Sequence, residues 1–559
     1  MDAVDQNRWL SLLALGMLFA LVLPLAMYAD SLNARQTTEP AVVLPPFEDI
    51  EALWAIEDAR TESAAPLVTC LENNGSPLGY DAQRNTFYCT LGLEAESDWP
   101  EIVLTAPEAS GVSIRFLDDY TYDWRDEAVA EGYPYELIAY TDTEYAYFDL
   151  VFTGLPIVSI FSGQEIGTEY VPAVASVSSA EHEAVRALIK AHTRGSAFHA
   201  DDQKVSYRLE FHRINQQGKD KKNAVSLLGM QADTDWLLIS NADEDTQLRN
   251  YLAWDMWQQW NKDGDAFSLL ESRMVEVFVN NEYRGLYQLM QRVDTDAQIV
   301  RMGGNPDTDC AFRILSPANV KERLVKSFKD TADVHFEVRK PPLRFTEESS
   351  FAILDDYIAL ADVKQGLLED DAFLRELAIH MDVEDLLSYY LFSQAISLQE
   401  DNVYNNLYVW AIADGGGYRY WYAPWDMDRS FVLCHAQFDQ PLLEGEDRIC
   451  TDLRIPYRLL ELDGLDSRRM LWSLWIEKRN TVLSDDALYQ WFHEAEDLVN
   501  LSGAFRRNSE RWYGAPENLD ISDLYNYTLK HLGTLDQFLR ECWPYGEYTP
   551  EGKPTITIR

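Results

Sequence analysis

The sequence has few basic residues for its length. It carries 47 Lys and Arg against 93 Asp and Glu, which gives a net charge of −46. A protein that grips a phosphate backbone needs a basic surface, so nucleic acid is not an expected partner. This excess of acid is typical of a solvated, self-repelling surface that keeps an exported protein soluble. A preference for basic substrates is the second interpretation.

Repeats, low-complexity tracts and zinc-ligand spacings are also missing from the chain. The sequence has no CxxC pair and no His/Cys spacing typical of zinc, which disfavours a zinc site. Hydrophobic residues make up 47% and aromatic residues 12% of the chain, enough for packed cores and too much for general disorder. With 559 residues, two or three domains are expected.

Only one long stretch lacks charged residues altogether, and it runs from Trp9 to Tyr28. At about 1.5 Å per residue, its roughly twenty residues span about 30 Å, the thickness of a bilayer core. No clear Ala-x-Ala cleavage site follows. The pattern therefore favours an uncleaved membrane anchor over a cleaved signal peptide for residues 1–30. Either way, the rest of the chain is expected to be extracytoplasmic, anchored by its N-terminus or secreted.

The six cysteines fit an oxidising compartment. Two pairs close short loops and are candidate disulfides. Six cysteines allow fifteen pairings, so the connectivity stays open. The candidate short-loop pairs are Cys70 with Cys89 and Cys434 with Cys450, and the remaining pair is Cys310 with Cys542.

Changes in composition and hydrophobic pattern along the chain predict its domain boundaries. Residues 31–62 are polar and proline-containing, with one short helical pattern, and are predicted to be a tether. Residues 63–154 alternate in short runs broken by turn residues, as in a small all-β sandwich of the Ig-like kind. Residues 155–545 place strands before helices, which predicts an α+β domain. Residues 546–559 are a tail.

Periodicity places several elements inside the α+β domain. Two of the strands flank Asn280-Asn281-Glu282, which predicts a structural hairpin. Strands are expected over residues 205–211, 274–280 and 285–293, and helices over residues 246–259, 349–365, 383–397, 468–483 and 522–540.

The segment from residue 400 to 430 carries the clearest chemical signal. Asp401 precedes Asn406 by five residues, the spacing of a protein-kinase catalytic loop. A Pro-Trp turn about twenty residues later leads to Asp426 and Asp428. Phosphoryl transfer uses one carboxylate to orient a hydroxyl, and an Asn with a second carboxylate to hold Mg²⁺ against phosphates.

Phosphate-binding groups are predicted earlier in the domain. The turn Arg194-Gly195-Ser196 presents backbone N–H groups beside a positive charge. Lys204 opens a strand, where its ammonium group is expected to reach the α- and β-phosphates as a kinase strand lysine does. The structural alternatives are an ordinary turn and a lysine that guards a sheet edge.

One further segment, residues 236–250, combines a strand with a helix start. Asp245 lies in the expected N-cap region, and Arg249 and Asn250 fall in the first turns of the helix. The alternative reading of this segment is purely structural.

Together these segments resemble the spore-coat kinase family, CotH. Its members share an Arg-Gly turn, a Lys-x-Ser-Tyr strand, a Trp-x-Leu-x-Ser-Asn…Leu-Arg-Asn helix start, a Gly-Leu-Tyr hairpin and an Asp-Asn-x-x-x-Asn…Pro-Trp-Asp-x-Asp core. The resemblance covers roughly residues 155–540. The same motifs stand in the same order at 194–196, 204–207, 236–250, 279–287 and 401–428.

The resemblance implies a small, atypical two-lobed protein-kinase-like domain that binds ATP with Mg²⁺ or Mn²⁺ and phosphorylates Ser or Thr of proteins. It also assigns a role to each matching position. By the resemblance, Asp401 is the catalytic base, Asn406 and Asp426 are metal ligands with Asp428 as a second candidate, Arg194, Gly195, Ser196 and Lys204 bind the nucleotide, and Asn402 and Arg249 support the site.

The chain departs from the family pattern at two places. Ser196-Ala197-Phe198 stands where Asn-Ser-Ser is usual, so the contacts of this turn with phosphate are expected to differ. The hairpin ends in Gln288-Leu-Met-Gln291, where an acidic residue is common, so the acidic partner of Lys204 is not assigned. Glu276 and Glu244 are both candidates for it.

Two functions fit these observations. The first is an exported protein kinase whose β-domain positions the enzyme or its substrate. The second is a non-catalytic surface scaffold or adhesin that keeps the kinase-like fold. The intact set of Asp401, Asn406 and Asp426 favours the enzyme.

Overall fold

The computed structural model describes most of the chain beyond residue 40. The predicted anchor at 1–30 and the tail at 546–559 lie outside the described residues. In the part that is described, no helix combines the length and hydropathy needed to cross a bilayer. The described residues are 41–93, 99–100, 102–107, 111–122, 124–195, 204–215, 217–261, 270–293, 305, 307–315, 335–340, 352–361, 368–398, 406–431, 434–435, 438–441 and 453–545.

The chain divides into two compact units, each assembled from separate stretches of sequence. Unit 1 comprises residues 1–242, 273–290 and 496–519. Unit 2 comprises residues 243–272, 291–495 and 520–559. The α+β class is confirmed, while the two-lobed kinase-like arrangement stays a prediction.

Unit 1 begins with a β-rich domain. The predicted tether is wrong over residues 41–62, because β1 pairs with β7 and β8 and so belongs to the sheet. The helix expected there is present as α2, which packs Leu53 and Ile56 against Ile138. The elements are β1 (Ala41–Leu44), α2 (Ile50–Ala59), β2 (Thr61–Glu62), β3 (Glu72–Asn73), β4 (Ser76–Pro77), β5 (Gly79–Asp81), β6 (Thr86–Thr90), β7 (Leu104–Ala106), β8 (Ser113–Phe116), α3 (Arg125–Glu131), β9 (Tyr135–Tyr140) and β10 (Glu144–Thr153).

The predicted Ig-like sandwich is not confirmed. An Ig-like domain packs two antiparallel sheets face to face. In the described part of the chain the strands join one hydrogen-bonded sheet in the order β4-β3-β7-β1-β8-β9-β10-β6-β5, with β2 added to β10. Three of its pairings, β1–β8, β10–β2 and β10–β6, are parallel. Period-two alternation identified the strands, but it carries no information about which strands pair.

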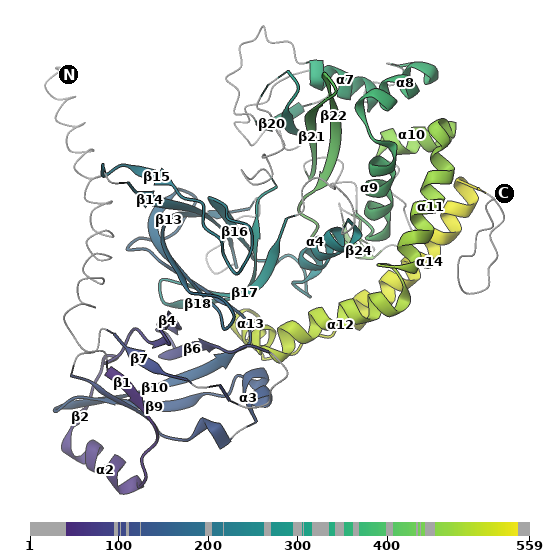
Figure 1. Cartoon of the computed structure of the whole chain (residues 1–559). Coiled ribbons are helices and arrows are strands. Elements are labelled where there is room, and N and C mark those ends of the chain that lie inside the picture. Colours follow the sequence, from purple (N-terminus) through teal and green to yellow (C-terminus); the bar gives the residue numbers. More distant parts are fainter. Residues whose placement is uncertain are drawn as a thin grey trace, which may run out of the picture. The chain divides into compact units, whose positions relative to one another are not determined.

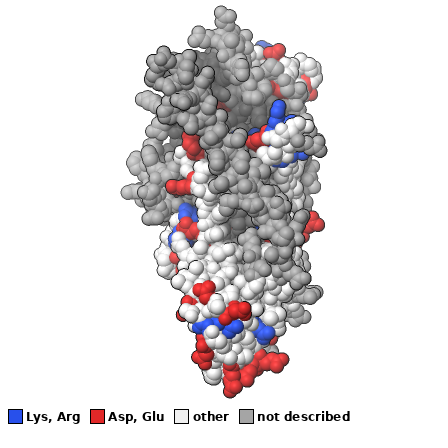
Figure 2. Space-filling view, turned by 90° about the vertical axis from the view of Figure 1, so that its left-hand side faces the viewer, with Lys and Arg blue, Asp and Glu red and all other residues white. Residues whose placement is uncertain are grey.

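The negative charge of the sequence appears on the surface of this domain. Acidic side chains gather at the lower end of the molecule in Figure 2, where α2 lies. Five acidic residues in and beside α2 are exposed: Glu48, Asp49, Glu51, Asp58 and Glu62.

The second part of unit 1 is a sheet that closes on itself (Figure 1). The order of its described strands is β13-β12-β11-β17-β18-β16-β14-β15, and an additional β13–β14 pairing joins the first strand to the seventh. Its interior is apolar, with Trp236, Phe211 and Tyr287 fully buried. The strands are β11 (Ile157–Phe161), β12 (Val171–Ser178), β13 (Val185–Arg194), β14 (Ser206–Ile214), β15 (Asp220–Lys222), β16 (Asp235–Ile239), β17 (Ser272–Val279) and β18 (Glu282–Gln291).

The predicted hairpin is confirmed as β17 and β18. Asn280 and Asn281 both have positive φ, 51° and 61°. Two successive positive φ angles form the turn that matches the twist of a two-stranded ribbon, and Asn tolerates them better than most residues.

Helix α13 (Ala504–Tyr513) closes unit 1 by binding the outside of this hairpin. Asn508 Oδ1 accepts a hydrogen bond from Leu286 N at 3.1 Å, and Trp512 Nε1 donates to Arg284 O at 3.0 Å. These are side chain to backbone contacts across more than two hundred residues of sequence. They hold β18 in place from outside the sheet.

The most buried contact of α13 is the ion pair of Arg507 with Glu276. Arg507 donates to both carboxylate oxygens of Glu276 at 3.0 and 2.8 Å, and the Glu276 side chain is fully buried. The Tyr283 hydroxyl donates to the same carboxylate at 2.6 Å. Arg507 also donates to Thr153 Oγ1 and Ser502 O, so one guanidinium joins the β-domain, β17 and α13.

Apolar contacts support the ion pair on the side of the β-domain. Tyr88 of β6 stacks on Tyr283 of β18 with ring centroids 5.5 Å apart. Gly79 of β5 lies so close to Phe278 that an added Cβ would stand 2.5 Å from the ring. The two sheets of unit 1 therefore pack directly against each other.

Unit 2 is centred on α9 (Val383–Ala395), whose side chains from Tyr389 to Ala395 are all buried. The helix packs against α11 and α14 and against β22, and Figure 1 shows these helices lying alongside one another. The described strands of the main sheet of this unit run in the order β20-β19-β21-β22. The elements are α4 (Arg249–Trp260), β19 (Cys310–Leu315), β20 (His335–Lys340), α7 (Ala352–Leu360), α8 (Asp370–His380), β21 (Leu407–Asp414), β22 (Gly417–Pro424), β23 (Cys434–His435), β24 (Phe438–Pro441), α10 (Arg454–Leu462), α11 (Ser467–Asn480), α12 (Asp485–Leu501) and α14 (Ser522–Cys542).

The five helices predicted from periodicity are confirmed, as α4, α7, α9, α11 and α14. Helices α8, α10, α12 and α13 were not predicted. Neither was the β21–β22 hairpin, although its Asp414-Gly-Gly-Gly417 turn is a strong turn signal.

The buried ion pair allows a direct test of what joins the parts of unit 1. Replacing Arg507 by Ala leaves the Glu276 charge buried without its partner, which costs about 3–5 kcal/mol of unfolding free energy. The matched control is Arg506→Ala, because Arg506 pairs with the half-exposed Glu131 at 3.0 Å on the surface. That loss is expected to cost less than about 1 kcal/mol. Urea unfolding of both variants measures the difference, and equal losses would contradict this role of Arg507.

Candidate functional site

The β21–β22 hairpin brings two of the predicted metal ligands to the same end of a sheet. Leu407 pairs with Pro424 in the hairpin register. Asn406 immediately precedes Leu407, and Asp426 follows Pro424 by two residues. Asn406 is half-buried and Asp426 is exposed. An amide and a carboxylate separated by twenty residues of sequence are therefore placed within a few residues of one hairpin end.

The turn that carries Asp426 is fixed by hydrogen bonds to buried backbone. Met427 N donates to Asn250 Oδ1 at 2.9 Å. Ser430 Oγ donates back to Met427 O at 2.7 Å, and Phe431 N donates to Ile396 O at 2.8 Å. Met427, Ser430 and Phe431 are all buried, so the turn is anchored while Asp426 remains accessible.

The backbone at Asp426 is strained. Its φ is 55°, in the left-handed region that residues other than glycine seldom adopt. Such strain persists only where the surroundings impose it, and it concentrates at functional sites. Here the hydrogen bonds donated by Met427 N and Phe431 N hold the turn in this conformation.

Asp428 is the electrostatically perturbed residue of this turn. Its pKa is raised to about 7, first by burial and second by the neighbouring charge of Asp426. Asp243 and Glu244 add to the effect, while Arg429 opposes it. A carboxyl group held partly protonated by a second carboxylate is a group that a bound cation would stabilise in its ionised form.

Glu244 has a structural role that the sequence did not assign to it. Its carboxylate accepts from Arg249 N at 2.8 Å and from Thr246 N at 3.0 Å, so it satisfies the N-terminal amides before and at the start of α4. Burial raises its pKa. The N-cap position of α4 is Leu248 and not the predicted region at Asp245, and the side chain that binds the first helical amide comes from Glu244. Arg249 lies 3.7 Å from the same carboxylate and supports the helix start.

The residue of this segment that contacts the Asp426 turn is Asn250, in the first turn of α4. The sequence motif predicts Arg249 as the supporting residue and assigns no role to Asn250. The Leu-Arg-Asn motif was the sequence signal that could have pointed to Asn250. The Asn250 side chain is only 3% exposed, and a buried polar side chain needs a hydrogen-bond partner.

In unit 1, the β13–β14 hairpin gathers the predicted phosphate-binding residues at one end. Arg194 ends β13 and pairs with Ser206 of β14. Gly195 follows with φ at 118°, a conformation that favours glycine. Lys204 stands two residues before Ser206. A basic residue, Arg194 or Lys204, therefore stands at each end of the loop that connects β13 and β14. Ser196 lies outside the described residues.

Lys204 is not a lysine guarding an exposed sheet edge. Its side chain is buried, its ammonium donates to Leu286 O, and it lies 4.9 Å from the centre of the Tyr287 ring. Glu276 is excluded as its acidic partner, because both Glu276 oxygens bind Arg507 and Tyr283. Glu244 is engaged at the start of α4.

Two more of the predicted site residues fall outside the part of the chain that the structure describes. Asp401 and Asn402 are not among the described residues. Among those that are, no three His, Cys, Asp or Glu side chains gather as a metal-holding group. Kinase magnesium is held by one or two carboxylates plus an amide and substrate phosphates, a donor set that Asn406, Asp426 and Asp428 fit.

The predicted disulfide between Cys70 and Cys89 is not formed. Cys89 is a free, buried thiol whose pKa burial raises to about 12. The third pairing also fails, because Cys310 is buried with a free thiol and Cys542 is an exposed one. Short spacing in sequence did not place the sulfur atoms together. Cys450 and the side chain of Cys434 lie outside the described residues.

The raised pKa of Asp428 predicts how pH changes the stability of the metal-free protein. An unfolded Asp has a pKa near 3.9, so between about pH 4 and 7 the folded state binds the proton more tightly. The unfolding free energy contributed by Asp428 is therefore lost as pH rises toward 7. Asp428→Asn removes this loss, and its melting temperature is expected to exceed the wild type at pH 8 by a few degrees. At pH 5 the two should differ little.

Asp520→Asn is the matched control for this experiment. Hydrogen bonds from Ser522 lower the pKa of Asp520, so it stays ionised throughout this pH range. Its difference from wild type should not change between pH 5 and 8. A pH-independent effect of Asp428→Asn would contradict the perturbed carboxyl group.

Comparison with known proteins agrees with the motifs found in the two units. A search of curated proteins finds no match. The family described as CotH kinase protein matches residues 191–539, which is more than half of the chain. The match begins within β13, just before the Arg194 turn, and ends within α14. The chain therefore belongs to the CotH kinase protein family.

Proposed function

We propose that this chain is an exported protein kinase that transfers the γ-phosphate of ATP to Ser or Thr of extracytoplasmic or surface proteins, with Mg²⁺ or Mn²⁺. Family membership supports a kinase-like protein. The observation that carries the proposal is the anchored turn that exposes Asp426 beside the perturbed carboxyl of Asp428. A purely structural surface turn has no need for an exposed carboxylate beside a second carboxyl group whose pKa is raised by burial and by that neighbouring charge.

The metal-holding residues in this proposal are Asn406, Asp426 and Asp428. Oxygen ligands of this kind suit Mg²⁺ and Mn²⁺. A bound cation would neutralise charge on the β- and γ-phosphates. The anchoring of Met427 by Asn250 matters because a preorganised carboxylate needs no rearrangement to meet the cation. Asn402 and Arg249 keep their supporting roles.

The remaining roles follow the family motif. Asp401 accepts the proton of the substrate hydroxyl and orients it as the catalytic base. Lys204 and Arg194 contact phosphate oxygens, with the backbone of Gly195 and Ser196 beside them. Lys204 is held by Leu286 O and the Tyr287 ring, which limits the rotamers of its long side chain. Exported location and the N-terminal membrane anchor are part of the same proposal.

The central test measures phosphate transfer with and without Asp426. The purified protein is incubated with Mn²⁺ and ATP labelled on its γ-phosphate, and incorporated label is counted. Asp426→Ala is expected to lose at least about 100-fold of the activity, the scale of removing one preorganised charge-stabilising group. Thermal stabilisation by Mn²⁺-ATP should disappear as well.

Asp414→Asn is the matched control. Asp414 lies at the opposite end of the same hairpin, half-exposed and paired with Arg419 at 2.6 Å. Its loss should leave transfer within about twofold of wild type, the scale of a surface ion pair. Equal, background-level label in wild type and Asp426→Ala would leave the non-catalytic scaffold or adhesin as the function.

A second variant tests the phosphate-binding half of the proposal. Lys204→Met keeps the volume of the buried side chain and removes its charge. Phosphate transfer is expected to fall by about 100-fold or more, because a strand lysine on the phosphates is part of the kinase machinery. Lys190→Met, which breaks a surface ion pair with Asp220 in the same sheet, is the control. A folded Lys204→Met protein with full activity would remove Lys204 from the site.

A further inference from the structure

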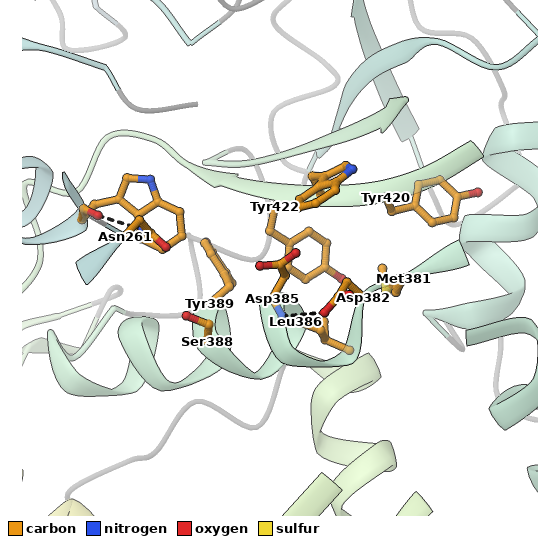
Figure 3. A pocket seen from close by; sticks show the side chains of 11 residues that line it. Asn261, Met381, Asp382, Asp385, Leu386, Ser388, Tyr389, Tyr420 and Tyr422 are labelled. Carbon is orange, nitrogen blue, oxygen red and sulfur yellow. Dashed lines mark hydrogen bonds between the residues drawn. The ribbon is translucent and has the colours of Figure 1, made fainter. Parts of the chain in front are cut away.

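The two ends of helix α9 are held by different means. At its start, Asp382 caps the helix by accepting hydrogen bonds from Glu384 N at 2.9 Å and Asp385 N at 3.2 Å. Figure 3 shows this first turn beside the pocket between α9 and β22. Such a cap is local, because the side chain satisfies free amides of its own helix. The far end of α9 depends instead on α14, which lies beside it (Figure 1).

The chain leaves α9 through a turn in which glycine is the usual residue. Leu398 N donates to Ser393 O at 2.9 Å. Ser397 N donates to Gln394 O at 3.0 Å. These two bonds form a Schellman motif, whose residue after the C-cap is left-handed and most often glycine. Here that residue is Ser397, with φ at 55°. The motif alone does not call for a serine, because glycine adopts this conformation at no steric cost.

The hydroxyl group of Ser397 is bound from α14. Tyr527 OH donates a hydrogen bond to Ser397 Oγ at 3.1 Å. One turn later on α14, His531 Nε2 lies 2.6 Å from Gln394 O, and it is the donor because a carbonyl oxygen only accepts. His531 is buried, and its ring stacks on that of Tyr527 with centroids 5.7 Å apart. Helix α14 therefore holds the end of α9 by one backbone carbonyl and one side chain.

The same turn contacts the segment that carries Asp426. Ile396 O, in the middle of the turn, accepts a hydrogen bond from Phe431 N at 2.8 Å. Phe431 has a positive φ of 56°, and its ring packs against Trp491 and Phe492 of α12. Strained backbone is therefore found on both sides of this hydrogen bond, and strain of this kind persists only where the surroundings impose it. Moving the end of α9 would break the bond and loosen the Asp426 turn.

We propose that Ser397 is a positioning residue of the phosphate-transfer site, held in place by Tyr527 and His531 of α14. Its left-handed backbone and its bound hydroxyl group fix where α9 ends, and the Ile396 carbonyl then holds the Asp426 turn. The effect reaches the reacting atoms only through the backbone. In naming the reaction, the inference rests on the proposed function.

Ser397→Gly separates positioning from stability. Glycine suits φ at 55°, which offsets the loss of one hydrogen bond, so the melting temperature is expected to stay within a few degrees of wild type. The kcat of phosphate transfer is expected to fall by about tenfold or more, because a small displacement of a catalytic group is costly. Tyr527→Phe removes only the donor hydroxyl and should lower kcat to the same extent. The double variant should be no slower than either single variant, because both remove one contact.

Thr528→Val is the matched control. Thr528 is as buried as the residues tested, but its hydroxyl donates only within its own helix, to Leu524 O at 2.9 Å. Its loss is expected to lower the melting temperature by a few degrees and to leave kcat within about twofold of wild type. A purely structural role for Ser397 predicts the reverse order, with kcat following the melting temperature in all variants, and that result would overturn the proposal.

Hydrogen exchange of residues 427–431, measured by mass spectrometry without nucleotide, tests the same link independently of catalysis. Ser397→Gly and Tyr527→Phe should speed exchange in this segment by about tenfold or more, and Thr528→Val should not, because only the first two loosen the turn. Wild-type exchange in Ser397→Gly would overturn the proposal at any rate of transfer. Faster exchange with full kcat would overturn it as well. Faster exchange in a protein whose wild type transfers no phosphate would support the link from α14 to the Asp426 turn and refute the kinase.

Discussion

The ion pair of Arg507 with Glu276 is the contact on which unit 1 depends. It joins a helix near the C-terminus to a central strand and, through Thr153, to the β-domain. A fully buried carboxylate is tolerable only when its charge is paired and its oxygens are hydrogen-bonded, and Arg507 and Tyr283 meet both conditions. The pair therefore fixes where α13 lies, and α13 in turn holds Leu286 and Arg284 of β18 by their backbones. The same β18 carbonyl at Leu286 receives the ammonium of Lys204. Strand β18 therefore both contacts α13 and holds Lys204, the candidate phosphate-binding residue.

Unit 2 poses a different electrostatic problem, because it places two carboxylates of like charge close together in sequence. Asp426 and Asp428 stand on one turn, and the pKa of Asp428 is raised mainly by burial and then by the charge of Asp426. The turn is held by Asn250, Ser430 and Phe431 through bonds to buried backbone, so the repulsion cannot relax by moving the chain. Stability is given up locally at an anchored site, as is common where a ligand completes the electrostatics.

The parts of this structure that the sequence predicted are those with local signals. The helices α9 and α14 begin at the predicted residues because periodicity and, for α9, the capping carboxylate of Asp382 are local. The Asn280-Asn281 hairpin was predicted for the same reason. The site motifs were recognisable as an ordered set, although no single one was decisive. The sequence did not predict contacts between residues that are far apart in the chain. Examples are Arg507 with Glu276, separated by 231 residues, and Asn250 with Met427, separated by 177. The Cys70–Cys89 disulfide and the tether failed because spacing and composition say little about which strands and sulfur atoms meet.

The proposed kinase activity requires a divalent cation held at the Asp426 turn together with nucleotide. Electron paramagnetic resonance of Mn²⁺, titrated into the protein with a non-hydrolysable ATP analogue, measures that binding directly. We expect saturable Mn²⁺ binding in the wild type and in Asp414→Asn, and its loss in Asp426→Ala. Mn²⁺ binding that is the same in all three proteins, or absent from all three, would contradict it.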